Sequence, residues 1–179
     1  VALGVLGTIN FYRGETRQAR KNIQEALNHA RQEKATAKEM ICIWGLAQIE
    51  ESEGANESAE AHYRQVLEMR EETGDIHDAL PMLCSAATFF AERQREKEIM
   101  MCIKAASEMA SATGNSEALG TLAYTLGENA LLHNKPAEAI QQFSQAIAHF
   151  QKVEIPPVLL NAEFRIGLAY ARAGSKNNA

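Results

Sequence analysis

The chain has little that would hold a fold together by disulfides or metal ions. Among its 179 residues there are three cysteines, and no two of them form a Cys-x-x-Cys motif. An odd number of thiols without paired spacing is not typical of a disulfide framework and indicates a reducing, cytoplasmic compartment. The five histidines include no His-x-x-x-His pair, and no cysteine pair has the spacing of zinc ligands. We therefore expect no metal and no cofactor.

Long apolar runs and a basic surplus are also missing. No run approaches the roughly 18 consecutive apolar residues of a transmembrane helix, and no signal peptide is visible, so we expect no membrane partner. The formal net charge of −5 argues against direct nucleic-acid binding, because phosphate neutralisation requires a basic face. Aromatic residues make up only 6% of the chain, and Val, Ile and Thr never dominate a run. This composition favours helices over strands.

What the sequence does contain is a repeat of 40 residues. Steps of 40 from Gly7 meet a small residue each time, and the same steps from Gly14 meet residues suited to a turn. A fixed period between 20 and 50 residues is typical of repeat architectures. The small positions are Gly7, Ala47, Ala87, Gly127 and Gly167, and the turn positions are Gly14, Gly54, Gln94, Asn134 and Gly174.

Each period contains apolar residues at helical spacing on both sides of its turn, which predicts two antiparallel helices in each unit. The triplet Thr73-Gly74-Asp75 recurs 40 residues later as Thr113-Gly114-Asn115, and it predicts that glycine ends one helix while Asp or Asn caps the next. Pro81 is expected in the first turn of its helix, where a missing N–H costs little. The last helix is expected over residues 158–172. The predicted units are residues 1–40, 41–80, 81–120 and 121–160, with a half unit over 161–179.

The motif that carries a family resemblance is the small residue after Leu6, the turn glycine at 14, Ala19, the bulky Ile23 and Ala26. It resembles the tetratricopeptide repeat, clearly in the first, second and fourth units and weakly in the third. The resemblance implies an all-α fold, a right-handed α-solenoid of antiparallel helix pairs with about nine helices, forming a single domain over 1–179. The 40-residue unit is similar to that of sensor arms in bacterial transcriptional activators and signalling ATPases, and to that of kinesin-light-chain scaffolds.

The same resemblance implies why small residues recur at these positions. They are expected where the first helix of a pair crosses the second closely, so that larger side chains would clash. Ile99, which replaces alanine in the third unit, is expected to widen that pair. The chain begins with Val and stops where a further helix should begin, so we expect it to be a fragment of a longer protein.

By analogy with the family, the first helices line a concave groove that holds a partner. Trp44 is the only tryptophan, and an aromatic residue in a groove is a common anchor for a bound peptide. The alternative is that Trp44 and Tyr124 fill space between neighbouring first helices. The groove residues expected from the resemblance are Thr8, Trp44, Gln48, Cys84, Thr88, Tyr124, Glu128 and Phe164.

The sequence contains only weak candidates for a group of catalytic residues. Cys84 and His77 are seven residues apart, about 10 Å along a helix, which favours a packed thiol over a nucleophile with its base. Glu50, Glu51 and Glu53 resemble paired carboxylates, but their place beside a predicted turn favours a solvated edge. We therefore expect a protein that is not an enzyme.

Three functions are open from the sequence. The first is a protein- or peptide-binding scaffold or sensor arm of a larger cytoplasmic protein, of the bacterial regulatory kind. The second is a homo-oligomerisation module, because no following helix covers Ile166, Leu168 and Tyr170 of the last predicted helix. The third is a small-molecule effector domain that would use Trp44, Gln48 and Thr88.

Overall fold

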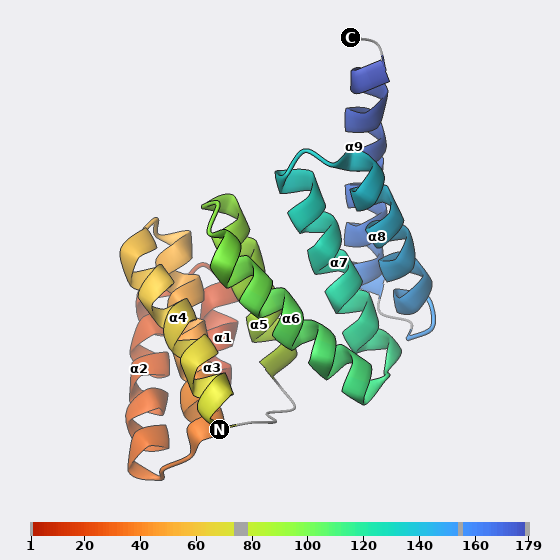
Figure 1. Ribbon diagram of the computed structural model, residues 1–179. Coiled ribbons are helices and arrows are strands. Elements are labelled where there is room, and N and C mark those ends of the chain that lie inside the picture. Colours follow the sequence, from red (N-terminus) through yellow and green to blue (C-terminus); the bar gives the residue numbers. More distant parts are fainter. Residues whose placement is uncertain (1, 74–78, 154–155, 178–179) are drawn as a thin grey trace. The chain divides into compact units, whose positions relative to one another are not determined.

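The computed structural model describes residues 2–73, 79–153 and 156–177, and these residues form nine α-helices and no strand (Figure 1). The predicted all-α repeat fold is confirmed. The chain divides into two compact units, residues 1–76 and 77–179, which are described separately below. The first unit contains α1 (Ala2–Tyr12), α2 (Thr16–Gln32), α3 (Thr36–Ser52) and α4 (Asn56–Thr73). The second contains α5 (Ala79–Glu92), α6 (Glu96–Thr113), α7 (Ser116–Leu132), α8 (Pro136–Phe150) and α9 (Pro156–Asn177).

Helices end where the backbone turns left-handed. Gly14, Gly54 and Gly114 have positive φ, as expected from their turn positions, and so do Gln94 (φ 56°) and Asn134 (φ 56°). A left-handed residue directly after a helix satisfies carbonyls of its last turn. Lys34 (φ 53°) does the same after α2 and was not predicted, because its side chain gives no turn signal.

The structure confirms some of the other predicted helix ends and contradicts one. Asn115 caps α7 by accepting a hydrogen bond from the Ala118 N–H at 2.7 Å, and Pro81 lies in the first turn of α5, as predicted. Gly74 and Asp75 lie outside the described residues. The prediction of a turn at Gly174 was wrong, because α9 continues through it.

Replacing Gln94 by glycine should stabilise the second unit by about 1 kcal/mol. A left-handed backbone costs a residue with a Cβ roughly 1–2 kcal/mol, and glycine avoids most of that cost. The side chain of Gln94 is exposed, so little packing is lost. Chemical denaturation of Gln94→Gly against Gln94→Ala measures the effect, since alanine keeps the Cβ and should give no gain. Equal stability of the two variants would contradict this explanation.

The first unit packs its helices closely at the predicted small positions. An atom added at Gly7 as a Cβ would lie 2.4 Å from Cγ1 of Ile23, on the antiparallel α2. Ala19, Ala47 and Ala59 are fully buried. Because these positions carry little or no side chain, the helix axes approach and Ile23 fills the space between them.

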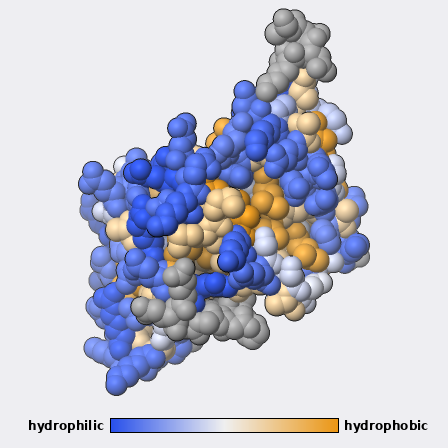
Figure 2. Space-filling view, in the orientation of Figure 1, coloured by the Kyte–Doolittle hydropathy of each residue, from blue (hydrophilic) through white to orange (hydrophobic). Residues whose placement is uncertain are grey.

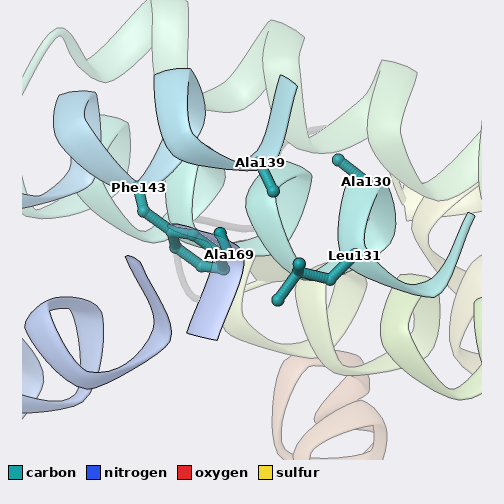
Figure 3. Packing of buried hydrophobic residues seen from close by; sticks show 5 residues of the cluster. All are labelled: Ala130, Leu131, Ala139, Phe143 and Ala169. Carbon is teal, nitrogen blue, oxygen red and sulfur yellow. The ribbon is translucent and has the colours of Figure 1, made fainter. Parts of the chain in front are cut away.

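The second unit repeats this packing around Phe143 of α8. Figure 3 shows the ring of Phe143 beside Ala169 of α9, with Ala130, Leu131 and Ala139 in the same cluster. A Cβ at Gly127 would lie 2.7–2.8 Å from three atoms of this ring. The aromatic ring thus occupies the place that a side chain at 127 would need.

Gly167 departs from the prediction made for the small positions. A Cβ at Gly167 would meet no atom within 4 Å, and the residue is exposed. The expectation of a close helix crossing at Gly167 was therefore wrong, because no described helix lies against that face of α9. Ile99 is buried, while the expected widening of its helix pair stays a prediction.

Candidate partner-binding surface

Three of the predicted groove residues lie on the first helices of the first unit. Trp44 and Gln48 are one turn apart on α3 and both are half-buried, whereas Thr8 is exposed on α1. The Thr8 hydroxyl donates to the Gly4 carbonyl oxygen at 3.2 Å. The indole Nε1 of Trp44 is buried and has no hydrogen-bond acceptor, which is an uncommon and costly state for an N–H group.

The remaining five lie on α5, α7 and α9 of the second unit. On α5, Cys84 is buried and its carbonyl oxygen accepts a hydrogen bond from the Thr88 hydroxyl at 3.2 Å. Burial raises the pKa of the Cys84 thiol to about 11 and that of Cys102 to about 12. Both thiols are therefore protonated near neutral pH and are poor nucleophiles. His77, the base considered for Cys84, lies outside the described residues.

Tyr124 and Glu128 belong to one polar cluster between α7 and α9. Glu128 is only 7% exposed, and both of its oxygens accept hydrogen bonds from the guanidinium of Arg165. Burial, and then the Glu128 carboxylate, raise the pKa of Tyr124. The Tyr124 ring also packs edge-on against Phe143, with ring centroids 5.5 Å apart. Phe164, by contrast, is 65% exposed on α9.

The structure thus joins Tyr124 to Glu128 through Arg165, a residue that the sequence analysis did not select. Packing of Tyr124 against Phe143 agrees with the alternative in which this tyrosine fills space between helices. A partner-binding role for the eight residues stays a prediction.

A second polar network joins α2, α3 and α4 in the first unit. Glu50 is buried and accepts from Arg20 Nη1 at 3.3 Å, and His62 Nδ1 lies 2.7 Å from its other oxygen. Glu51 accepts from the Tyr63 hydroxyl at 2.7 Å. The prediction of a solvated edge was wrong for Glu50, because a helix from the neighbouring pair covers it and supplies Arg20. This network binds three helices together, and Arg20 Nη2 also donates to the exposed Glu53 at 2.6 Å.

Partly exposed apolar side chains form a row on α7. Leu119, Leu122 and Leu126 are half-buried and lie three or four residues apart, so they share one helix face. Figure 2 shows hydrophobic residues gathered over α7 on the face that it presents.

A cavity of about 440 Å³ lies in the first unit between α1, α2 and α3. Most of its lining is apolar, and Glu33 and Lys38, which form an ion pair of 2.8 Å, are among the polar groups. Thr8 also lines it, while Trp44 and Gln48 do not. Its size and composition are those of a small-ligand pocket.

Within residues 2–73, 79–153 and 156–177, no group of three or more His, Cys, Asp or Glu side chains could hold a metal ion. In the same part of the chain, each helix is too short or too polar to cross a lipid bilayer.

The side chain of His133, at the end of α7, makes contacts in the second unit that depend on its protonation state. Its Nε2 lies 2.9 Å from the Glu96 carboxylate and its Nδ1 lies 2.8 Å from the Asn129 carbonyl oxygen. Only the doubly protonated ring can donate to both, so Glu96 first, and then Asn129, raise the pKa of His133. The contribution to stability is complete below the unfolded-state pKa of about 6.5 and is lost as pH rises through the higher folded-state value.

We expect the Glu96→Gln variant to lower the pKa of His133 and to be less stable than the wild type at pH 5 but nearly equal at pH 9. The difference should be at most about 0.5 kcal/mol, because the pair is exposed and screened by solvent. NMR titration of the imidazole and urea unfolding at the two pH values measure both effects. An unchanged His133 titration in Glu96→Gln would contradict the assignment.

The stacked helix pairs of the two units define a helical-repeat protein. Residues 1–72 match the family model of the tetratricopeptide repeat. The chain is also similar to a solved structure titled crystal structure of BtubC (BKLC) from P. vanneervenii, with a TM-score of 0.77 and 19% sequence identity over 96% of this chain and 72% of that chain. That likeness shows the fold alone. No curated protein matches the chain significantly. Tetratricopeptide repeats are typically non-catalytic scaffolds for protein–protein interaction.

Proposed function

We propose that this chain binds a protein or peptide segment on the exposed face of its first helices and acts as an arm of a larger cytoplasmic regulatory protein. The observation that supports it is the pairing of a tetratricopeptide-repeat match over residues 1–72 with Trp44 and Gln48 on a first helix of that region. The low aromatic content of 6% and the divergence among the repeat units favour a bacterial regulator as the parent. No catalysis is part of this proposal.

Trp44 is the residue on which the proposal depends most. Its ring is half-buried, but the indole N–H has no acceptor. An unsatisfied buried donor costs about 1–3 kcal/mol. A bound segment that offers a backbone carbonyl would remove this cost if the ring turned toward it. Gln48, one turn further along α3, would add a donor and an acceptor for the same backbone.

Peptides selected from a displayed random library against the 179-residue chain test the proposal. Because Trp44 is the only tryptophan, its fluorescence should shift when such a peptide binds. Trp44→Ala should weaken binding by at least about tenfold, as loss of an aromatic anchor does. Trp44→Phe should weaken it less, because only the N–H is lost.

The matched control for this test is Met100→Ala, which removes a large, exposed apolar side chain from α6, a second helix. It should leave the affinity unchanged. Full binding by a folded Trp44→Ala variant would exclude this surface as the binding site.

A second candidate function, homo-oligomerisation, is favoured by the exposed apolar side chains of α9. The sequence named Ile166, Leu168 and Tyr170 for this role. Ile166 instead packs against the core of α7 and α8, so that part of the expectation was wrong. The large exposed residues of α9 are Leu160, Phe164 and Tyr170.

The third candidate, a small-molecule effector domain, is favoured by the cavity between α1, α2 and α3. The residues that the sequence offered for it, Trp44, Gln48 and Thr88, do not line that cavity. A ligand of the cavity should raise the melting temperature of the chain. An unchanged melting temperature across a panel of small apolar acids and amines would count against it.

A further inference from the structure

The cavity between α1, α2 and α3 has a filled counterpart in the fourth 40-residue repeat. A residue 120 positions after a residue of the cavity wall holds the matching position in that repeat. Most positions of the cavity wall recur there as members of one packed apolar cluster between α7, α8 and α9. The same place is thus a cavity of about 440 Å³ in the first repeat and a solid core in the fourth.

Two aromatic side chains of the fourth repeat have no equivalent in the first. Phe150, which is 1% exposed, matches Ala30, and Tyr124, which packs against the same cluster, matches Gly4. These rings belong to α7 and α8, the helices that correspond to α1 and α2. The cavity is therefore open because of the residues in its own walls, and not because a neighbouring helix is absent.

Helix packing gives no reason for glycine at position 4. A Cβ added at Gly4 would meet no described atom within 4 Å, whereas a Cβ at Gly7, one turn further along α1, would lie 2.4 Å from Ile23. Glycine is a poor helix former, so Gly4 weakens α1 without relieving a clash. What it provides is space on the side of the cavity, whose wall it forms.

Two charged residues of opposite sign stand at the edge of the open cavity. Glu33 and Lys38 form their ion pair of 2.8 Å there, and about half of each side chain is exposed. The matching residues of the fourth repeat, Val153 and Val158, pack against the apolar cluster. The hydrogen bond from Lys38, and then its charge, lower the pKa of Glu33, so both groups are charged near neutral pH.

We propose that this cavity binds a free α-amino acid with an aromatic side chain. The inference rests on the third candidate function above and names its ligand. The ring of the ligand occupies the space that the Phe150 ring fills in the fourth repeat, and the volume is within the range of small-ligand pockets. The α-carboxylate accepts a hydrogen bond from Lys38, and the α-ammonium donates one to Glu33.

The opposite charges at the edge select a ligand that itself carries both charges. A simple aromatic acid would place its carboxylate near Glu33, and a simple aromatic amine would place its ammonium near Lys38, so each would meet a like charge. A zwitterion pairs with both residues. The ammonium of lysine has three donors and a carboxylate has several acceptor sites, so Glu33 and Lys38 can bind the ligand and keep their own hydrogen bond.

Isothermal titration calorimetry of the 179-residue chain with L-phenylalanine tests the proposal. We expect a dissociation constant between about 10 and 500 µM, as for a small ligand held by one ring and two charges. Three analogues each lack one part of the ligand: L-phenylalaninamide has no carboxylate, 3-phenylpropionate has no ammonium and L-alanine has no ring. Each should bind at least about fivefold more weakly than L-phenylalanine.

The Gly4→Tyr variant tests the place of binding, because it restores the residue that the fourth repeat has at this position. Its ring should enter the cavity and abolish the binding of L-phenylalanine. A Cβ at residue 4 meets no described atom, so the helicity measured by circular dichroism should be preserved.

The Lys38→Met variant tests the role of the charge. It should weaken the binding of L-phenylalanine at least about fivefold but should not weaken that of L-phenylalaninamide, which has no carboxylate to pair with Lys38. The matched control is Lys21→Met, the same change at an exposed position of α2 that is not part of the cavity wall. It should leave both affinities unchanged.

Three results would overturn the inference. Full binding of L-phenylalanine by a folded Gly4→Tyr variant would place the site elsewhere. Equal affinities for L-phenylalanine, its amide and 3-phenylpropionate would show that the two charges are not read, while the cavity could still serve another ligand. If L-phenylalanine does not bind but another small acid or amine raises the melting temperature, only the ligand class is wrong. If no compound does so, the effector function fails as well.

Discussion

Replacing Arg165 by methionine should destabilise the second unit by about 2–3 kcal/mol. The Glu128 carboxylate is buried on α7, and both of its oxygens accept hydrogen bonds from the Arg165 guanidinium on α9. Methionine keeps the aliphatic stem but removes both donors, so a charged group would be left buried and unpaired. Breaking a buried pair from one side costs about 3–5 kcal/mol, and the partial exposure of Arg165 lowers this.

Native-state hydrogen exchange of the α9 amides measures the effect locally, and urea unfolding measures it for the whole chain. The control is Arg172→Met on the same helix, where a single hydrogen bond from Nη1 to the Leu131 carbonyl oxygen, 3.1 Å long, would be lost. That variant should lower the free energy of unfolding by about 1 kcal/mol. Equal costs for the two variants would show that the charge of Glu128 is not what makes Arg165 important.

The double variant Glu128→Gln with Arg165→Met isolates the charge. Removing the carboxylate together with its partner leaves no unpaired buried charge, so the double variant should be more stable than Arg165→Met alone. If the free energy of unfolding lost in the double variant equals the sum of the losses in Glu128→Gln and in Arg165→Met, the two side chains act independently. In that case the ion pair does not hold α9 to α7.

How much of this could be predicted from the sequence depends on whether a residue's role is local. Periodic small residues and turn residues encode helix ends and crossings over about 20 residues, so the helix pairs, the cap at Asn115 and the place of Pro81 followed directly. The turn at Lys34 was missed because its left-handed backbone is imposed by the chain reversal and not by a residue that favours it.

Contacts between neighbouring pairs were harder to predict. Glu50 looked like a surface carboxylate because its partners, Arg20 and His62, come from other helices at sequence distances of 30 and 12 residues. Arg165 was overlooked for the same reason, since Glu128 is 37 residues away. No single-helix pattern reveals such a partner. The eight predicted groove residues lie on α1, α3, α5, α7 and α9, but their binding role stays a prediction, because exposure depends on which neighbours cover each helix face.

Gly127 and Gly167 hold the same position in the repeat, and substituting alanine at each should change stability in opposite directions. At Gly127 the new Cβ would lie 2.7–2.8 Å from the Phe143 ring, which is fully buried and packed against Ala169 and Leu131. The ring cannot move without disturbing that cluster. Overpacking of this kind costs about 1–3 kcal/mol, so Gly127→Ala should be destabilising even after the gain in helix propensity.

At Gly167 the same substitution adds a Cβ that meets nothing within 4 Å. Only the helix-propensity term acts there, and it should stabilise α9 by about 0.5–1 kcal/mol. Urea unfolding compares the free energies of unfolding of the two variants. Because the gain in helix propensity is common to both variants, we expect their stabilities to differ by the overpacking cost of about 1–3 kcal/mol.

A Phe143→Leu background identifies the cause of that difference. Leucine removes the ring atoms that the Gly127→Ala Cβ would meet, so the cost of Gly127→Ala should fall sharply in this background, while the effect of Gly167→Ala should not change. Coupling between residues in contact is commonly 0.5–3 kcal/mol. Equal effects of alanine at the two glycines would mean that the position in the repeat, and not the neighbouring helix, sets the requirement for glycine. The small residues would then owe their periodicity to the helix itself, and the close antiparallel crossing would lose its explanation.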